Sequence, residues 1–481
     1  MGIVSLSLVL HSRLVSPYHS QTRPIRLSQS NWFQAPIPAR TKHTSLSIIR
    51  AQSGARKEEI VIVGAGIAGL ATALSLHRLG IGSLVVEQAE SLRTSGTSLT
   101  LFKNGWRVLD ALGVGDDLRN QFLEVQGMVV TTAEGNELRS FKFKEEDESQ
   151  EVRAIERRVL LETLANQLPQ GAVRFSSKLA KIEKIEDGDT LLQLVDGTQL
   201  SAKVVNESLT SKFTASRISA KYLFLMFMNF QQIVIGCDGI RSPIAKWMGF
   251  PEPKYAGHCG LRGLAFFPGG HKFEPKLNQI YGRGQRAGIV PISPTKVYWF
   301  VCFNMPSPGQ KITDPAVLKK LAKELLTNWP SDLLDIIDHT PDDTISRTPL
   351  VDRWLWPSIS PPASAGRVVL VGDAWHPMTP NLGQGACCAL EDSVILARKL
   401  AAAIESGPAA IEDALSSYGT ERWPRIFPLT IRANLIGSLL QWENPVVCSV
   451  RNNVIIPKLV KLGPMLEHTN FDCQPLQNQV V

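Results

Sequence analysis

Apolar residues lie along the chain in short runs that alternate with longer helical patterns. The run IVIV at 60–63 is β-branched, as expected for a strand that is buried on both faces. A helical apolar pattern follows it as far as Leu79 and ends near Gly80. Further strand-length runs lie at 84–86, 233–235, 368–371 and, as a strand–turn–strand pattern, 289–303. This alternation of strands with helices predicts an α/β fold.

Three glycines separate the first strand from the first helix. Gly64 permits a tight turn, Gly66 allows backbone N–H groups to approach a pyrophosphate, and Gly69 allows close packing of the helix on the strand. Glu87 ends the second strand, 21 positions after Gly66, where an acid can accept hydrogen bonds from ribose hydroxyls and repel a 2′-phosphate. This arrangement predicts a dinucleotide site; the alternative is a βα turn that binds nothing.

Two later segments favour FAD over NAD. Asp238-Gly239 follows the buried run 233–235, and Gly372-Asp373 follows the run 368–371. An aspartate at the carboxyl end of a strand can hydrogen-bond a ribityl hydroxyl. A helix that begins near Gly385 would present free N–H groups and about half a positive charge, which would stabilise an anionic reduced isoalloxazine.

With these three motifs in this order, residues 58–440 resemble the FAD-dependent monooxygenases of the para-hydroxybenzoate hydroxylase fold. They are most similar to the plant branch related to zeaxanthin epoxidase and salicylate-hydroxylase-like monooxygenases. The resemblance implies that NADPH or NADH binds transiently and reduces FAD. A flavin C4a-hydroperoxide, formed with O2, would then insert one oxygen atom into a small aromatic or isoprenoid substrate.

The resemblance also implies roles for single residues. Four residues would hold the ADP half of FAD: Gly64, Gly66, Gly69 and Glu87. Arg157 would help to hold the cofactor, Asp238 and Gly239 would serve both FAD and NADPH, and Gly372-Asp373 would bind the ribityl chain. Three residues would line the flavin: Pro380, Gly383 and Gly385. No side chain receives a catalytic role, because the flavin performs the chemistry, and His376 is interpreted as structural.

Two positions depart from the family pattern. Ala245 occupies a position seven residues after Asp238 that is usually arginine, and Cys387 stands where asparagine is frequent. Both departures occur in the plant branch. Two alternatives stay open: another flavin enzyme on the same fold, such as a prenyl reductase or halogenase, and a non-catalytic escort protein. A halogenase is disfavoured because its tryptophan signature is absent.

The expected architecture is a Rossmann-like FAD-binding domain of the glutathione-reductase type, with an inserted, mostly β substrate domain and C-terminal helices. The FAD-binding domain comprises 58–125, 151–204, 232–252 and 350–430, and the substrate domain comprises 126–150 and 253–349. We expect 142–151 to be an exposed loop. The C-terminal helical region, 431–481, packs on the body or, as the alternative, contacts a membrane surface. No apolar run reaches the ~20 residues of a spanning helix.

Charge and cysteine content exclude several classes of function. The 481 residues carry a net charge of +7, but six Lys and Arg and no acid lie in the first 50 residues. The remainder is nearly neutral, with 45 basic and 44 acidic residues, and gives no basis for nucleic-acid binding. Seven cysteines without C-x-x-C spacing predict neither a disulfide framework nor a metal site. The basic, acid-free start predicts a disordered transit peptide at 1–55, for the chloroplast or alternatively the mitochondrion; a tail without a targeting role is the other interpretation.

The resemblance implies that the strand pattern ending at Val204 runs directly into the one beginning at Val234, but here the segment 205–233 separates them. It is rich in Ser, Phe, Met, Asn and Lys and has neither helical nor alternating periodicity. We therefore expect an insertion foreign to the family, such as intron sequence translated in frame. It should form a disordered loop that compromises FAD binding.

Overall fold

The computed structural model describes residues 60–92, 98–184, 190–200, 233–406 and 409–476. The expected transit peptide at 1–55 lies outside these residues, as does the expected insertion at 205–233 except for its last residue, Ile233. Among the residues described, no helix is both long enough and apolar enough to cross a membrane.

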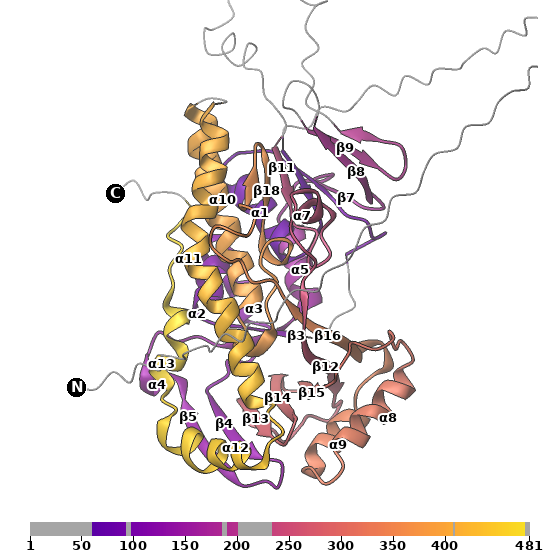
Figure 1. Cartoon of the computed structure of the whole chain (residues 1–481), viewed down its shortest axis with the longest axis vertical. Helices are drawn as coiled ribbons and strands as arrows, with labels where there is room; N and C mark the ends of the chain where they lie inside the picture. Colours follow the sequence, from indigo (N-terminus) through magenta and orange to yellow (C-terminus); the bar gives the residue numbers. More distant parts are fainter. Residues whose placement is uncertain (1–59, 93–97, 185–189, 201–232, 407–408, 477–481) are drawn as a thin grey trace, which may run out of the picture. The chain divides into compact units, whose positions relative to one another are not determined.

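A six-stranded sheet carries the three predicted motifs (Figure 1). Its strands, in spatial order, are β17 (Ser364–Ala365), β18 (Val368–Leu370), β11 (Ile233–Gly236), β1 (Ile60–Val63), β2 (Leu84–Val86) and β7 (Val173–Arg174). All neighbouring strands are parallel except β17 and β18. The four middle strands are buried along their whole length, which explains their continuous apolar sequences.

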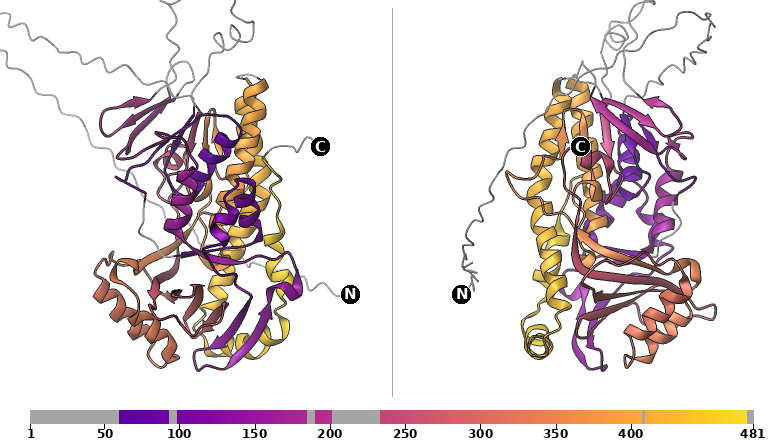
Figure 2. Two further views of the ribbon diagram at one scale, coloured as in Figure 1. Left: turned by 180° about the vertical axis from the view of Figure 1, so that it is seen from behind. Right: turned by 45° about the vertical axis from the view of Figure 1, so that its right-hand side comes forward.

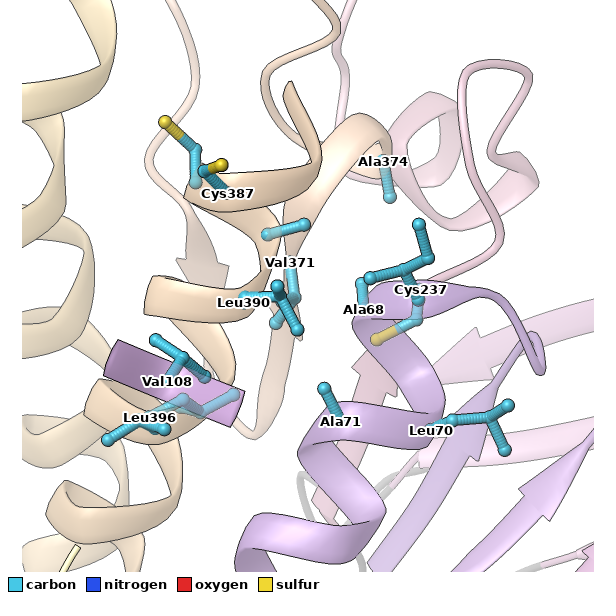
Figure 3. Packing of buried hydrophobic residues seen from close by; sticks show 14 of the residues in the cluster. Ala68, Leu70, Ala71, Val108, Cys237, Val371, Ala374, Cys387, Leu390 and Leu396 are labelled. Atoms are coloured by element: carbon cyan, nitrogen blue, oxygen red, sulfur yellow. The ribbon is translucent and has the colours of Figure 1, made fainter. Parts of the chain in front are cut away.

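Helices pack around this sheet. The long helix α10 (Gly385–Ser406) contacts α1 (Ile67–Arg78), α2 (Lys103–Ala111) and α11 (Ala409–Leu440). Figure 3 shows the small residues Ala68 and Ala71 of α1 in one buried cluster with Val371 and with Leu390 of α10. Small side chains allow the two helices to approach closely. The remaining helices of this layer are α3 (Gly115–Arg119), α5 (Arg157–Asn166) and α7 (Pro243–Trp247).

A seven-stranded sheet forms the second layer. Its strands, in spatial order, are β16 (Ser346–Asp352), β12 (Lys254–Phe266), β15 (Lys296–Asn304), β14 (Gln285–Ser293), β13 (Lys276–Tyr281), β4 (Gly127–Thr132) and β5 (Glu137–Lys142). One face packs on α8 (Pro315–Leu325) and α9 (Ser331–Asp338), with Trp299 and Leu261 in a core of its own. Alternate residues, such as Tyr298 and Leu264, join the core of the first layer instead. The face of the seven-stranded sheet that lies away from α8 and α9 therefore turns toward the nucleotide motifs (Figure 2).

The strand β16 shows to which sheet the residues around 350 belong. The predicted boundary at residue 350 falls inside β16, which pairs with β12 and so belongs to the second sheet. The expected loop at 142–151 contains a short helix, α4 (Phe143–Glu146), because burial of the Phe143 side chain stabilises one helical turn.

Small elements complete the fold. They are the pair β3 (Ser98–Leu101) and β6 (Arg153–Glu156), the sheet of β8 (Leu179–Lys184), β9 (Thr190–Leu194) and β10 (Gln199–Leu200), and the 3-10 turns η1 (Asp342–Thr344), η2 (Gly372–Ala374) and η3 (Pro380–Leu382). After α11 the chain forms α12 (Pro445–Val450), the π-helix η4 (Arg451–Leu459), α13 (Leu462–Leu466) and the 3-10 turn η5 (Glu467–Asn470).

Candidate functional site

The glycine-rich turn between β1 and α1 is packed against the second motif. Gly64 has φ +106°, and a Cβ there would lie 2.5 Å from the Cys237 carbonyl oxygen. A Cβ on Gly69 would lie only 1.9 Å from the Gly64 oxygen, whereas Gly66 has no atom within 4 Å of that position. The turn is therefore closed on its protein side and open at Gly66, where a phosphate would approach.

Glu87 stands beside this turn at the end of β2. Its buried carboxylate accepts hydrogen bonds from the backbone N–H of Ala65 at 2.8 Å and of Ala89 at 3.0 Å. These bonds fix the carboxylate next to the glycine turn. Because an ionised carboxylate has about four acceptor sites, Glu87 retains capacity for ribose hydroxyls.

Asp238 follows β11 and lies close to Gly64. Both of its carboxyl oxygens are buried and lack a well-formed hydrogen bond to a described residue, although Ser242 and the backbone of Ile244 lie near enough to favour the ionised form. Burial raises the pKa of this carboxyl to about 6. Gly239 has φ +81°, which a residue with a side chain rarely adopts. Buried acceptors without partners indicate that a ligand supplies the missing donors.

Asp373 follows β18 within the turn η2. It is accessible to solvent, yet the protein surrounds it closely enough that desolvation raises the pKa of its carboxyl, while the charges of His376 and Arg157 oppose that rise. A Cβ added to Gly385 would lie 4.0 Å from Asp373 Oδ1. The predicted residues Asp373 and Gly385 thus lie together, and the charge of Arg157, from a distant part of the sequence, acts on Asp373.

The loop 380–385 leads into α10. Gly383 adopts φ +64°, and a Cβ there would lie 2.9 Å from the Phe102 ring. Gly385 is the first residue of α10, whose 22 residues direct their dipole toward this loop. Gln384 accepts a hydrogen bond from Asn104 Nδ2 at 2.9 Å, and its own amide nitrogen is buried without a hydrogen bond to a described residue.

A buried network of charged side chains holds the turn η2, which carries Asp373. Asp392 of α10 accepts hydrogen bonds from the Gly372 N–H at 3.0 Å and from Arg422 Nε at 2.6 Å, and its Oδ2 lies 2.6 Å from His376 Nε2. Burial alone would raise the pKa of the Asp392 carboxyl, but His376 and Arg422 lower it to about 2. His376 is fully buried in this network, which agrees with a structural role. The neighbouring Glu391 pairs with Arg422 at 2.7 Å.

Sequence reasoning missed two arginines of the site. Arg353 donates to the carbonyl oxygens of Ala374 at 2.7 Å and Trp375 at 3.1 Å, so it supports the turn that carries Asp373. Arg286 of β14 is buried and donates to Asn381 Oδ1, in the loop predicted to line the flavin. Neither arginine has a motif around it, so no sequence signal marks it.

Arg286 gives the second sheet a cationic centre on the face that meets this loop. It also donates to Gln441 Oε1 at 3.4 Å, and its guanidinium carbon lies 5.5 Å from the centroid of the Phe300 ring. No acidic side chain among the described residues pairs with it. The site therefore offers a positive charge and aromatic rings opposite the 380–385 loop.

These observations fit FAD. Open space lies above Gly66, Asp238 has unpartnered acceptors, and Asp373 is accessible beside the positive end of α10. A family model described as "FAD binding domain" matches residues 57–432. The chain belongs to the FAD-dependent monooxygenases of the para-hydroxybenzoate hydroxylase family. The predicted family, fold class and FAD cofactor are thereby confirmed.

Named relatives support this assignment. Monooxygenase 2 of Arabidopsis thaliana is 33% identical over 431 residues, which are 87% of this chain and 98% of that protein. Monooxygenase 1 of the same plant is 32% identical, over 86% of this chain and 98% of its own. Klebsiella pneumoniae HpxO, solved with FAD and uric acid, has a TM-score of 0.68 at 22% identity, over 86% of this chain and 95% of HpxO. This last similarity concerns the fold.

Proposed function

We propose that this monooxygenase uses NADPH or NADH as a transient co-substrate and inserts one atom of O2 into a small aromatic or isoprenoid molecule, by hydroxylation or epoxidation. The observation that carries the substrate proposal is the pairing of Arg286 and Phe300 on the sheet face opposite the 380–385 loop. A planar substrate would stack on the ring, and a phenolate or carboxylate would meet the guanidinium. The uric acid bound to HpxO is a planar, acidic molecule of this kind.

Each part of the site has a role in this proposal. Glu87 and the open turn at Gly66 would hold the adenosine ribose and the pyrophosphate, and Asp373 would hold the ribityl chain. The positive end of α10 would stabilise negative charge on the ring. FAD, when bound, supplies electron transfer and the activation of O2. The apolar walls of the two layers exclude water, which would otherwise divert oxidising equivalents to peroxide.

We also propose import into the chloroplast, on the basis of the acid-free, Arg- and Ser-rich first 50 residues. Sequencing the N-terminus of the protein purified from its native tissue tests this proposal. A start near residue 51 is expected, and a retained Met1 would contradict it.

The enzymatic proposal is tested by measuring NAD(P)H oxidation with phenolics, salicylate and carotenoid fragments, and by incorporation of ¹⁸O from labelled O2. A substrate should stimulate oxidation and appear with one labelled oxygen. Stimulated oxidation that releases only peroxide with every compound class would overturn the proposal. A second preparation lacking 205–233 should bind more FAD, if that segment is the foreign insertion predicted above.

Arg286 can be tested in the same assay. Arg286→Met should raise KM for an acidic substrate roughly ten- to hundredfold, because a charged hydrogen bond contributes about 1.5–3 kcal/mol. The flavin absorption should be unchanged. Arg262→Met is the matched control, since Arg262 lies on the same sheet face but bonds to Thr348 Oγ1 instead of the flavin loop. Equal effects of the two substitutions would count against a role for Arg286 in substrate binding.

A further inference from the structure

The helical segment after α11 exposes large apolar residues although it buries some polar ones. Its buried residues include Gln441 and Arg451 together with Cys448 and Ile456. Its solvent side carries large apolar residues, which are Trp442 (49% exposed), Val446 (69%), Val450 (46%), Val454 (41%) and Leu459 (65%). The first four recur at every fourth position, from Trp442 just before α12 to Val454 in η4, and are hereafter called the apolar stripe. Leu435, near the end of α11, is exposed next to it in sequence.

Polar contacts hold the segment in this orientation. Arg451 donates to the carbonyl oxygens of Leu440 and Gly282, the latter at 2.9 Å, and its guanidinium carbon lies 5.6 Å from the centroid of the Tyr281 ring. Arg139 of β5 donates to the Pro457 oxygen at 2.9 Å. The segment is thus fastened to the second sheet through its polar side, so that it cannot rotate to bury its valines without breaking these bonds.

The stripe is concentrated rather than scattered. Among the residues described, twelve large apolar side chains are exposed, and six of them lie between 435 and 459. From their fractional exposures, the four side chains of the stripe and Leu459 together present on the order of 500 Å² of accessible surface. That is less than the ~800 Å² per partner of a stable protein interface. It is nevertheless comparable to the largest apolar patch of a typical monomer, which is often functional.

The charged and aromatic residues around the apolar stripe indicate what kind of surface it contacts. Two exposed lysines, Lys458 and Lys461, lie beside Leu459, whereas the exposed acid Glu443 follows Trp442 at the other end of the stripe and Arg451 is buried. Trp442 stands at one end of the stripe and the lysines near the other. An apolar helical face with flanking lysines and an interfacial tryptophan is suited to the headgroup region of an anionic bilayer. We propose that the apolar stripe docks this monooxygenase on the surface of an anionic membrane.

The stripe adjoins a surface cavity of about 660 Å³ that is widely open to solvent and is also lined by Glu443. Trp442 and Gln441 line one side of this cavity, and His258 and Asn304 of the second sheet line the other. Gln441 in turn accepts a hydrogen bond from Arg286, the residue opposite the flavin loop. If the function proposed above is correct, a lipid-soluble substrate would enter this cavity from the bilayer; the docking itself does not depend on that function.

Vesicle sedimentation of the purified, flavin-loaded full chain tests the docking. The probes are vesicles of phosphatidylcholine with about 30% phosphatidylglycerol, and vesicles of phosphatidylcholine alone. We expect binding to the anionic vesicles and at least roughly tenfold weaker binding of Val450→Glu/Val454→Glu. The neutral Val450→Ser/Val454→Ser should show an intermediate loss. Ile359→Glu is the matched control, because Ile359 is 81% exposed but lies far from the stripe in sequence.

Every variant retains the basic leader, so any binding by the leader is common to all of them and cancels in the comparison. Flavin absorption and circular dichroism check that each variant is folded. The proposal is overturned if the chain binds neither kind of vesicle, or if the stripe variants bind as tightly as Ile359→Glu. It is also overturned if the stripe joins two copies, which sedimentation equilibrium would reveal, or if binding requires removal of 205–233.

Discussion

Asp238 is expected to reduce the stability of the flavin-free protein at neutral pH. Its carboxyl is buried without a well-formed hydrogen bond, and burial raises its pKa from 3.8 to about 6 despite the opposing influence of Ser242 and the Ile244 backbone. The unfolded chain therefore releases this proton at lower pH than the folded chain does. Stability falls as pH rises from about 4 to about 6, and a shift of about 2 pKa units corresponds to about 3 kcal/mol at pH 7. Asp238→Asn removes the ionisation and should recover that energy.

Urea unfolding of flavin-free protein at pH 7.5 and pH 4.5 measures this effect. Asp238→Asn should be more stable than the parent by about 2–3 kcal/mol at pH 7.5, and the gap should shrink markedly at pH 4.5, where the parent carboxyl is mostly neutral in the folded state. FAD affinity should fall at the same time, because a ligand acceptor is lost. Asp116→Asn, at an exposed carboxylate, is the control and should change stability by less than about 0.5 kcal/mol. A parent as stable as Asp238→Asn at pH 7.5, or a gap independent of pH, would refute the reasoning.

Three further substitutions test the packing of the site. Gly69→Ala places a methyl group 1.9 Å from the Gly64 oxygen, so it should lower the midpoint of urea unfolding even without FAD. Gly66→Ala, with open space, should leave that midpoint unchanged and weaken FAD binding alone. Asp392→Asn breaks a buried ion-pair network and should lower the free energy of unfolding in urea at pH 7 by about 3–5 kcal/mol. The parent should lose this extra stability as the pH falls from about 4 toward 2, because its carboxyl then becomes protonated. Trp299→Phe removes the 2.8 Å hydrogen bond to Thr340 Oγ1 and should cost about 1–2 kcal/mol, with FAD binding unchanged.

The strands and motif turns of the first sheet could be predicted closely from the sequence. β1 and β2 have the predicted bounds because strands buried on both faces have continuous apolar sequences with sharp ends. The glycine positions were also predictable, since Gly64 and Gly69 are required by contacts within a single βα unit. Local sequence carries that information, because the interacting residues are neighbours along the chain.

The arginines of the site could not be predicted in this way. Arg286, Arg353 and Arg422 each act on a residue that is distant in sequence, and each is isolated among residues without a motif. Adjacent acids in an apolar helix, Glu391 and Asp392, do indicate that buried cations must exist, but they do not indicate which ones. The helix α4 was missed because one turn of helix depends on burial of a single phenylalanine.

The central position of β11 affects how the chain folds. β11 pairs with β1 and with β18, which lie about 170 and about 130 residues away in sequence. Such distant pairings require most of the loop-closure entropy to be lost before the contacts form, so slow folding is expected. During synthesis β1 must remain unpaired on this edge until β11 emerges from the ribosome. The nucleotide motif that comes first in the sequence is therefore completed only when β11, about 170 residues later, has joined the sheet.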